Sequence, residues 1–185
     1  MNGQTLRQIL SSDIIPHLDD HTTKHAAVLI VIYGEDHKII MTQKPLSMQQ
    51  HAGEISFPGG KIDASDENLL ETAIRETLEE IGLAVPRQNV IGQLKPVQTR
   101  NSGFTIIPFV AMLDQITQLH PNSEVDEILH FPIIPLLQTL RDDDDPGHRS
   151  LFEAYKLTYD NKMIWGASAR MLKQIADIFH SNQIL

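Results

Sequence analysis

Three glutamates on one stretch of predicted helix are the residues of this chain best suited to chemistry. Glu79 and Glu80 follow Glu76 by three and four residues, and side chains at these spacings share one face of a helix. Carboxylates this close repel one another, and they lie toward the carboxyl end of the helix, where the helix dipole disfavours negative charge. Clustered carboxylates suit Mg²⁺ or Mn²⁺, which keep positions open for water and phosphate oxygens. The pattern therefore predicts a divalent metal site.

A plainer interpretation stays open at this point. The glutamates could form a solvated face on which Arg75 neutralises Glu79 one turn further on, as in an acidic structural domain that binds no metal. Gly59 and Gly60, ahead of the helix, favour the metal site. Glycines let the backbone approach a ligand closely, and their carbonyl oxygens can join a metal shell. A glycine pair alone most often makes a turn, so it supports the metal site without establishing it.

The helix that carries the glutamates is predicted over residues 69–81. Its apolar residues recur at helical spacing and form one stripe, made of Leu70, Ile74, Leu78 and Ile81. Asp66 is the predicted N-cap, because aspartate commonly accepts hydrogen bonds from the first free N–H groups of a helix. Gly82 follows the last apolar residue and is predicted to end the helix.

Short strands and three further helices are predicted around it. Strands are predicted at residues 26–33, 38–43, 54–57, 89–96, 104–113 and 155–159. Helices are predicted at residues 3–10, 134–140 and 167–180, and residues 141–149 are predicted to form a solvated acidic loop. This order of elements predicts an α/β domain, with a mixed sheet flanked by helices, over residues 24–185. A helical extension over residues 1–23 precedes it.

The composition of the chain argues against several classes of binding partner and of chemistry. The 185 residues carry a net charge of −9, which argues against nucleic-acid backbones and anionic membrane surfaces as partners. The longest apolar run, residues 26–33, is far too short to cross a bilayer, and the N-terminus lacks the pattern of a secretory signal. Because the chain has no cysteine, thiolate chemistry is excluded and a cytoplasmic location is expected. No Gly-x-Ser-x-Gly elbow is present, so a triad hydrolase has no support.

Residues 57–83, FPGGKIDASDENLLETAIRETLEEIGL, resemble the Nudix box. The family pattern is Gly, five residues, Glu, seven residues, then Arg-Glu-apolar-x-Glu-Glu-x-Gly-apolar. Its second half is matched by Arg75, Glu76, Glu79, Glu80, Gly82 and Leu83. Thr77 stands in place of an aliphatic residue. The loop in the first half is one residue longer than the plain box, because five residues from Gly60 lead to Asp66, whereas seven residues before Arg75 lead to Glu67.

The longer loop resembles that of the coenzyme A pyrophosphatase branch, as does the segment IMTQKPLSMQQHAGEISFPGG before it. Six residues fit the branch motif at the correct spacing: Thr42, Gly53, Phe57, Pro58, Gly59 and Gly60. Three later segments also resemble the branch: residues 103–110, 124–127 and 164–169. The upstream motif departs at three positions, where Lys44 and Gln49 replace arginines and Pro45 replaces a small residue. Lys44 keeps the charge without the bidentate fork of arginine, and Gln49 loses the charge.

The resemblance implies a Nudix α/β/α sandwich and a metal-dependent hydrolase. The implied cofactor is Mg²⁺ or Mn²⁺, and its implied ligands are Glu76, Glu79, Glu80 and a carbonyl of Gly59 or Gly60. Arg75 would orient the carboxylates. A glutamate of the cluster would accept a proton, or else Glu124 or Glu127 from outside it. Four residues are the predicted substrate-binding groups: Lys44, His51, Lys61 and Arg100.

The implied substrate is coenzyme A or an acyl-CoA, cut into phosphopantetheine and adenosine 3′,5′-bisphosphate. An ADP-ribose or dinucleotide pyrophosphatase is the alternative within the family. A non-catalytic nucleotide-binding module is a third candidate, although such modules usually lose a box glutamate. Trp165 could stack on adenine or belong to the core, and His51 could contact substrate or be structural. The expected partner is a small nucleotide, and a homodimer stays possible.

Overall fold

The computed structural model describes residues 2–17, 24–48, 51–99, 103–146, 148 and 154–185. Strand β1 (Lys24–Tyr33) lies at the centre and pairs in parallel with β7 (Phe104–Leu113) along its whole length. Residues 26–32 of β1 are all buried. An uninterrupted apolar run of this kind belongs to a strand that is covered on both faces.

The main sheet is mixed. Its strand order is β3-β2-β1-β7-β5, with β4 paired to β1, β6 to β7 and β8 to β2. Among the strand pairs of the described residues, β1 and β7 alone run parallel to each other. The other strands are β2 (Lys38–Gln43), β3 (Ile55–Ser56), β4 (Gly59–Lys61), β5 (Val90–Gln93), β6 (Val97–Gln98) and β8 (Glu127–Pro132), and a 3-10 turn, η1 (Arg87–Asn89), precedes β5.

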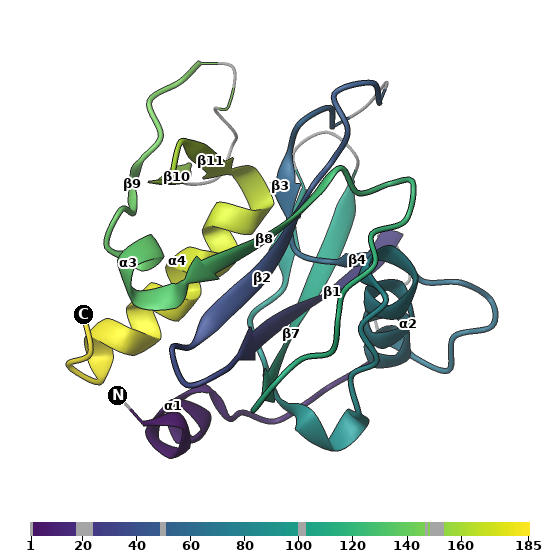
Figure 1. Ribbon diagram of the computed structural model, residues 1–185, viewed down its shortest axis with the longest axis horizontal. Coiled ribbons are helices and arrows are strands. Elements are labelled where there is room, and N and C mark those ends of the chain that lie inside the picture. The colour runs from purple at the N-terminus through teal and green to yellow at the C-terminus, as the bar shows by residue number, and fades with distance from the viewer. Residues whose placement is uncertain (1, 18–23, 49–50, 100–102, 147, 149–153) are drawn as a thin grey trace.

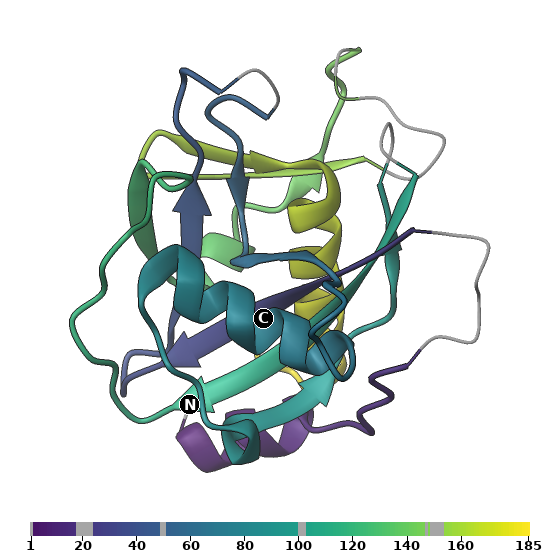
Figure 2. The same cartoon turned by 90° about the vertical axis from the view of Figure 1, so that its right-hand side faces the viewer.

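Helices cover both faces of this sheet (Figures 1 and 2). Helix α2 (Leu69–Ile81) packs against the odd-numbered residues of β1 from Ala27 to Val31. Helices α1 (Gly3–Leu10) and α4 (Gly166–Ser181) pack against the even-numbered residues from Val28 to Ile32. Alternate strand residues face opposite sides, so the predicted α/β/α sandwich with a mixed sheet is confirmed. Within the described residues, no helix is long and apolar enough to cross a membrane.

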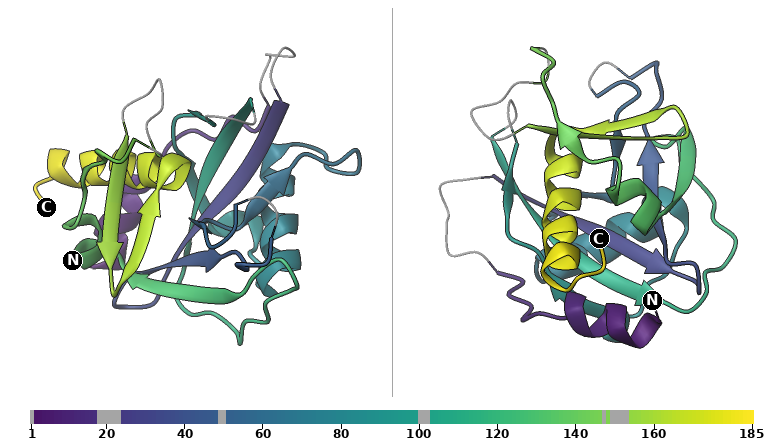
Figure 3. Two further views of the ribbon diagram at one scale, coloured as in Figure 1. Left: turned by 90° about the horizontal axis from the view of Figure 1, so that it is seen from above. Right: turned by 90° about the vertical axis from the view of Figure 1, so that its left-hand side faces the viewer.

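A small second sheet lies beside β3 and α4, as the view from above in Figure 3 shows. Its strand order is β11-β10-β9, and its members are β9 (Arg141–Asp142), β10 (Tyr155–Tyr159) and β11 (Lys162–Trp165). The short helix α3 (Ile133–Leu137) packs near β10. The second sheet therefore extends the face of the molecule that α4 covers.

The predicted elements match the structure least well where strands are short. The sequence pattern does not predict β4, β6, β8, β9 or β11, most of which are only two to four residues long. β8 is the exception in length, and it carries a signal: buried Leu129 and Phe131 alternate with exposed His130. That period-two alternation is typical of a half-buried strand.

The prediction of a solvated acidic loop over residues 141–149 is wrong at two points. Residues 141–142 form β9, and the Asp143 side chain is buried. An Asp143 oxygen lies 2.9 Å from His148 Nδ1, and another lies 3.8 Å from Lys156 Nζ. These partners compensate the burial of the carboxylate, whereas the neighbouring Asp144 is exposed as predicted.

Helix α2 occupies the predicted range with a different cap. Its N-cap is Asn68, whose side-chain oxygen accepts hydrogen bonds from two N–H groups of the first turn (2.9 and 3.2 Å). Asp66 is not the N-cap, because the helix begins three residues after it, at Leu69. Gly82 ends the helix as predicted, in the left-handed region with φ 71°.

The apolar stripe predicted for α2 is only partly correct. Leu70 and Ile81 are buried and Ile74 is half-buried, but Leu78 is 49% exposed. The buried face instead includes Glu80, which is 6% exposed. A prediction based on apolar residues alone misplaces the buried face of α2, because it does not expect a glutamate side chain to face the sheet.

Candidate active site

The candidate site lies where strands β1 and β2 separate. The two strands pair only at their hairpin end, through two residue pairs. Further along, β1 takes β4 as its neighbour and β2 takes β3, while β8 pairs with β2 along the whole length of β2. The chain crosses from the β2 side to the β1 side at Phe57 and Pro58, and the Pro58 carbonyl accepts a hydrogen bond from the Leu29 N–H (2.9 Å). Gly59 and Gly60 follow directly, at the point of separation.

Neither glycine has room for a side chain. A Cβ on Gly59, which has φ 156°, would lie 2.2 Å from the carbonyl oxygen of Ala27. A Cβ on Gly60 would lie 2.4 Å from the carboxyl group of Glu76. The missing side chains therefore let β4 lie tightly against β1 and let the Glu76 carboxylate reach the backbone of β4.

Glu80 is the most deeply buried of the three box glutamates. It lies on α2 with 6% exposure and accepts a hydrogen bond from the Gly59 N–H (3.3 Å). Burial raises the pKa of Glu80 to about 7, although the charge of Lys44 and the Gly59 N–H act in the opposite direction. The negative charges of Glu76 and Glu124 raise it further. Among the described residues Glu80 forms no salt bridge.

Glu124 reaches the same site from a loop that is tied to the end of α2. The N–H groups of His120 and Asn122 donate to the carbonyls of Ile81 and Glu80 (both 2.9 Å). These bonds satisfy carbonyls that a helix end leaves free. The Asn122 side chain in turn accepts a hydrogen bond from the Glu124 N–H (2.8 Å), so the loop holds Glu124 in place. Glu127, the other outside candidate, pairs instead with Lys162.

Glu76 and Glu79 share a cation. The Arg75 Nη1 lies 2.9 Å from a Glu76 oxygen and 3.1 Å from a Glu79 oxygen. Burial raises the pKa of Glu76, and Arg75 opposes that rise. The side chain of Glu79 is 55% exposed. Arg75 thus pairs with Glu79 as the plainer interpretation expects, but Glu80 is buried and Glu76 is only 20% exposed, so these glutamates do not form a solvated face.

Asp66 is the residue that fixes Arg75. Two guanidinium nitrogens of Arg75 donate to its two oxygens (both 2.8 Å), which is a bidentate pair. The Arg75 guanidinium holds the pKa of the Asp66 carboxyl well below its usual range. Thr72 also donates to Asp66 (2.9 Å). The sequence pattern predicts Asp66 as an N-cap rather than as the partner of Arg75. The signal for this partnership is the loop from Gly60, which is one residue longer than in the plain box and leaves five residues between Gly60 and Asp66.

The predicted substrate-binding residues are dispersed. Lys44 lies near Glu80, since its charge lowers the pKa of that carboxyl. His51 Nδ1 pairs with Glu54 at 2.6 Å, and Lys61 lies over the ring of Phe104. Arg100 and Gln49 lie outside the described residues. Trp165, the candidate for adenine stacking, is stacked against His148 with ring centroids 4.0 Å apart.

The carboxylates fit a divalent cation. Within the described ranges, no three His, Cys, Asp or Glu side chains are already arranged as a metal site. The donor chemistry nevertheless suits one, because the charges of Glu76 and Glu124 both raise the pKa of Glu80, and Glu76 and Glu80 are at least partly buried. Buried carboxylates need a compensating cation, and Mg²⁺ and Mn²⁺ prefer hard oxygen donors.

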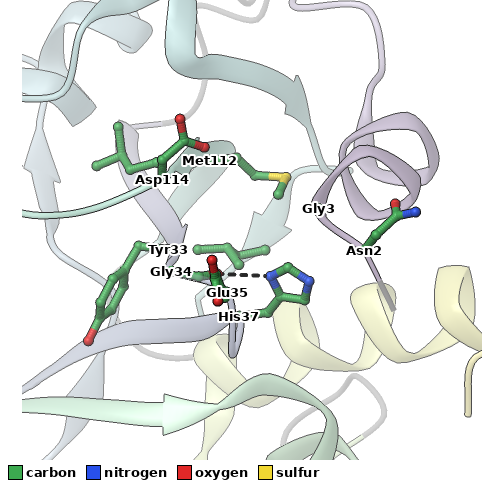
Figure 4. Close-up of a pocket in the computed structure, with 10 residues that line it drawn as sticks. Asn2, Gly3, Tyr33, Gly34, Glu35, His37, Met112 and Asp114 are labelled. Carbon is green, nitrogen blue, oxygen red and sulfur yellow. Dashed lines mark hydrogen bonds between the residues drawn. The ribbon is translucent and has the colours of Figure 1, made fainter.

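A cavity of about 470 Å³ lies elsewhere, between the start of α1 and the β1–β2 hairpin (Figure 4). Its lining includes Asn2, Glu35, His37 and Asp114, and His37 Nδ1 lies 3.1 Å from the Gly34 carbonyl. None of the predicted site residues lines it. Chemistry rather than volume therefore identifies the site at the separation of β1 and β2.

Comparison with known proteins identifies the family of this chain. The model of the NUDIX domain family matches residues 23–155. NudL of Yersinia enterocolitica, an uncharacterized Nudix hydrolase, is 32% identical over 189 residues, which cover 95% of this chain and 93% of NudL. NudL of Pectobacterium atrosepticum is 31% identical over 160 residues, covering 84% of this chain and 83% of that protein.

Solved structures share the fold. A MutT/nudix family protein from Enterococcus faecalis has a TM-score of 0.60 at 13% identity, covering 91% of this chain and 66% of that one. The NUDIX domain of Shewanella oneidensis NrtR, crystallised with ADP ribose, has a TM-score of 0.52 at 19% identity, covering 64% of this chain and 79% of that one. The chain belongs to the Nudix family and is a Nudix hydrolase, as the resemblance of residues 57–83 to the Nudix box predicts.

Proposed function

We propose that this Nudix hydrolase cleaves the pyrophosphate linkage of coenzyme A or an acyl-CoA, giving phosphopantetheine and adenosine 3′,5′-bisphosphate. One observation carries the hydrolytic part: the buried carboxylate of Glu80, which forms no salt bridge among the described residues, accepts the Gly59 N–H and lies near the charges of Glu76 and Glu124. The CoA part rests on the branch motif that ends in Phe57-Pro58-Gly59-Gly60 and on the longer loop that follows.

Glu76 and Glu80 are the proposed ligands of Mg²⁺ or Mn²⁺, with Glu79 and a carbonyl of Gly59 or Gly60 as further donors. When bound, such a cation neutralises pyrophosphate charge and makes water more acidic. Glu76 and Glu80 differ from Glu79 in being more buried. Glu80, which forms no salt bridge among the described residues, therefore bears the cost of a buried charge in the apo protein, whereas Arg75 compensates Glu76.

Glu124 is the proposed proton acceptor. It stands outside the helix, is exposed, and lies close enough to affect the pKa of both Glu76 and Glu80. An exposed carboxylate is free to take a proton from an attacking water and to release it to solvent. Arg75 is fixed by its bidentate pair with Asp66. It would in turn hold the carboxylates of Glu76 and Glu79 in the orientation that faces the substrate.

Lys44 is the proposed first contact for the substrate phosphates, because it lies near Glu80 at the separation of the strands. Its single ammonium replaces the arginine of the branch motif and lacks the bidentate fork. That departure favours a second candidate function, the hydrolysis of ADP-ribose or a dinucleotide, in which the CoA-specific contacts are not needed.

A substrate panel separates these candidates. The protein is incubated with Mg²⁺ or Mn²⁺ and with CoA, acetyl-CoA, ADP-ribose, NADH or diadenosine tetraphosphate, and the products are identified by mass spectrometry. Glu80→Gln serves as the inactive control. We expect the highest kcat/KM on CoA or acetyl-CoA. A clear preference for ADP-ribose or a dinucleotide would replace the CoA assignment. Turnover of no substrate, with nucleotide binding retained, would indicate a non-catalytic module.

The double variant Lys44→Arg, Gln49→Arg tests the upstream motif directly. It restores both arginines of the branch, so the KM for CoA should fall about tenfold while that for ADP-ribose changes little, since a charge-assisted hydrogen bond contributes roughly 1.5–3 kcal/mol. An equal response on both substrates would mean that these positions supply only general attraction.

A further inference from the structure

Three side chains outside the glutamate site form a cluster, which we call the two-lysine cluster: Lys24, Lys61 and Phe104. The Nζ atom of Lys61 lies 5.3 Å from the centroid of the Phe104 ring, and that of Lys24 lies 5.8 Å from it. Lys24 is opposite Phe104 in the β1–β7 pairing, and Lys61 is opposite Ala26 in the β1–β4 pairing. Lys24 and Ala26 share one face of β1, so all three side chains stand on the same face of the sheet.

Both ammonium groups lie near the same ring, so the distance between their two Nζ atoms is no greater than the sum of their distances to its centroid. β1 is the neighbour of β7, and β4 lies beyond β1, so Lys24 and Lys61 come from strands on the same side of β7. Among the described residues, neither lysine forms a salt bridge, although the chain carries a net charge of −9. The π face of the ring attracts both cations, but two neighbouring ammonium groups repel each other. An anion between them would relieve that repulsion.

The cluster adjoins the candidate active site. Lys61 directly follows Gly60 on β4, and roughly 7 Å of extended backbone separates it from Gly59. Gly60 faces Glu76, so the alternation of the strand turns Lys61 to the opposite face, the one covered by α4. A substrate that lies at the separation of β1 and β2 can therefore have its reacting bond near the glutamates and another group near the lysines.

We propose that the two-lysine cluster binds a non-reacting phosphate monoester of the nucleotide, the 3′-phosphate of the adenosine in a CoA-type substrate. This inference rests on the proposed function. A 3′-phosphate stands one ribose away from the reacting pyrophosphate and carries close to two negative charges, which two ammonium groups match. ADP-ribose and diadenosine polyphosphates lack this group, so the cluster selects 3′-phosphorylated substrates over them.

Binding of products tests this without requiring turnover. Titration calorimetry compares adenosine 3′,5′-bisphosphate with 5′-AMP, in Mg²⁺, on the wild type and on the double variant Lys24→Gln, Lys61→Gln. Lys38→Gln is the control for loss of a lysine charge elsewhere: it removes one positive charge at the opposite end of β1, where Lys38 pairs with Tyr33, whereas the double variant removes two. Lys24→Met, Lys61→Met is a second version that keeps the apolar stems over the ring, and thermal melts check the fold of each variant.

The wild type and the Lys38→Gln control should bind the bisphosphate about tenfold more tightly than AMP. In both double variants that preference should fall to about twofold or less, while the affinity for AMP stays within about a factor of two. A wild type without the preference, or a double variant that keeps it, would overturn the proposal. So would an equal loss of affinity for both ligands. The proposed function fails separately, if the wild type leaves CoA intact while the binding preference is present.

Discussion

Replacing Glu80 by glutamine should stabilise the metal-free protein while it abolishes catalysis. Glu80 is buried against Gly59 without a salt bridge among the described residues, and the charges of Glu76 and Glu124 lie nearby. Glutamine keeps the size of the side chain and an oxygen that can accept the Gly59 N–H, but it carries no charge. The change therefore removes a buried charge that destabilises the metal-free protein. The proposed metal site needs the same charge as a ligand, so catalysis is lost.

The size and pH dependence of this effect follow from the pKa of Glu80, which burial raises from 4.5 to about 7. Because the folded state holds the proton more tightly than the unfolded state, stability falls as the pH rises from about 4.5 to 7. Full ionisation above that range costs about 3 kcal/mol, at 1.36 kcal/mol for each unit of pKa. Glu80→Gln should recover roughly that amount at pH 8, or about 6–12 °C in Tm, and almost nothing near pH 4.5.

Thermal melts in EDTA at pH 4.5 and pH 8 measure the effect, with Glu79→Gln as the matched control. Glu79 is 55% exposed, so its replacement should change stability by about 0.5 kcal/mol or less at either pH. Mg²⁺ should raise the Tm of the wild type and should raise that of Glu80→Gln much less. A Glu80→Gln protein that is no more stable than the wild type at pH 8, or equally stabilised at both pH values, would refute the reasoning.

The remaining predictions concern the metal, the Arg75 anchor and the proton acceptor. Removal of metal by EDTA should abolish turnover, and Mg²⁺ or Mn²⁺ should restore it in a steady-state assay, whereas Ca²⁺ should serve poorly because it prefers longer bonds. Asp66→Asn should cost about 3 kcal/mol in urea unfolding at neutral pH. Since the pKa of Asp66 is lowered in the folded state, that difference should shrink as the pH falls below about 4. Glu124→Gln should lower kcat roughly 100-fold with little change in KM; an unchanged kcat would remove Glu124 as the proton acceptor.

The sequence predicts well the helix and strand that carry the site, because local patterns of residues determine these elements. The helix over residues 69–81, the stop at Gly82 and the doubly covered strand β1 each depend on residues close together in the chain. The cap of α2 is predicted wrongly at Asp66, since Asn68 is an equally suitable cap. The choice is decided by the distant Arg75, which takes the Asp66 carboxylate as its partner.

Tertiary contacts decide what local patterns leave open. Glu80 is buried because the sheet divides beneath it, and no spacing rule places a carboxylate on an otherwise apolar face. Lys24, Lys61 and Phe104 meet only because β1 pairs with both β4 and β7. Residues that are tens of positions apart along the chain give no sign of such a meeting in a single sequence.

The most direct test of the central claim is the fate of CoA itself. Wild-type protein and Glu80→Gln are each incubated with CoA and Mg²⁺, and separately with CoA and EDTA, and the products are separated and identified by mass spectrometry. Cleavage at the pyrophosphate predicts equal amounts of phosphopantetheine and adenosine 3′,5′-bisphosphate from the wild type with Mg²⁺, and neither product under the other conditions. Intact CoA in the presence of wild-type protein and Mg²⁺, or the same products from Glu80→Gln, would contradict the account.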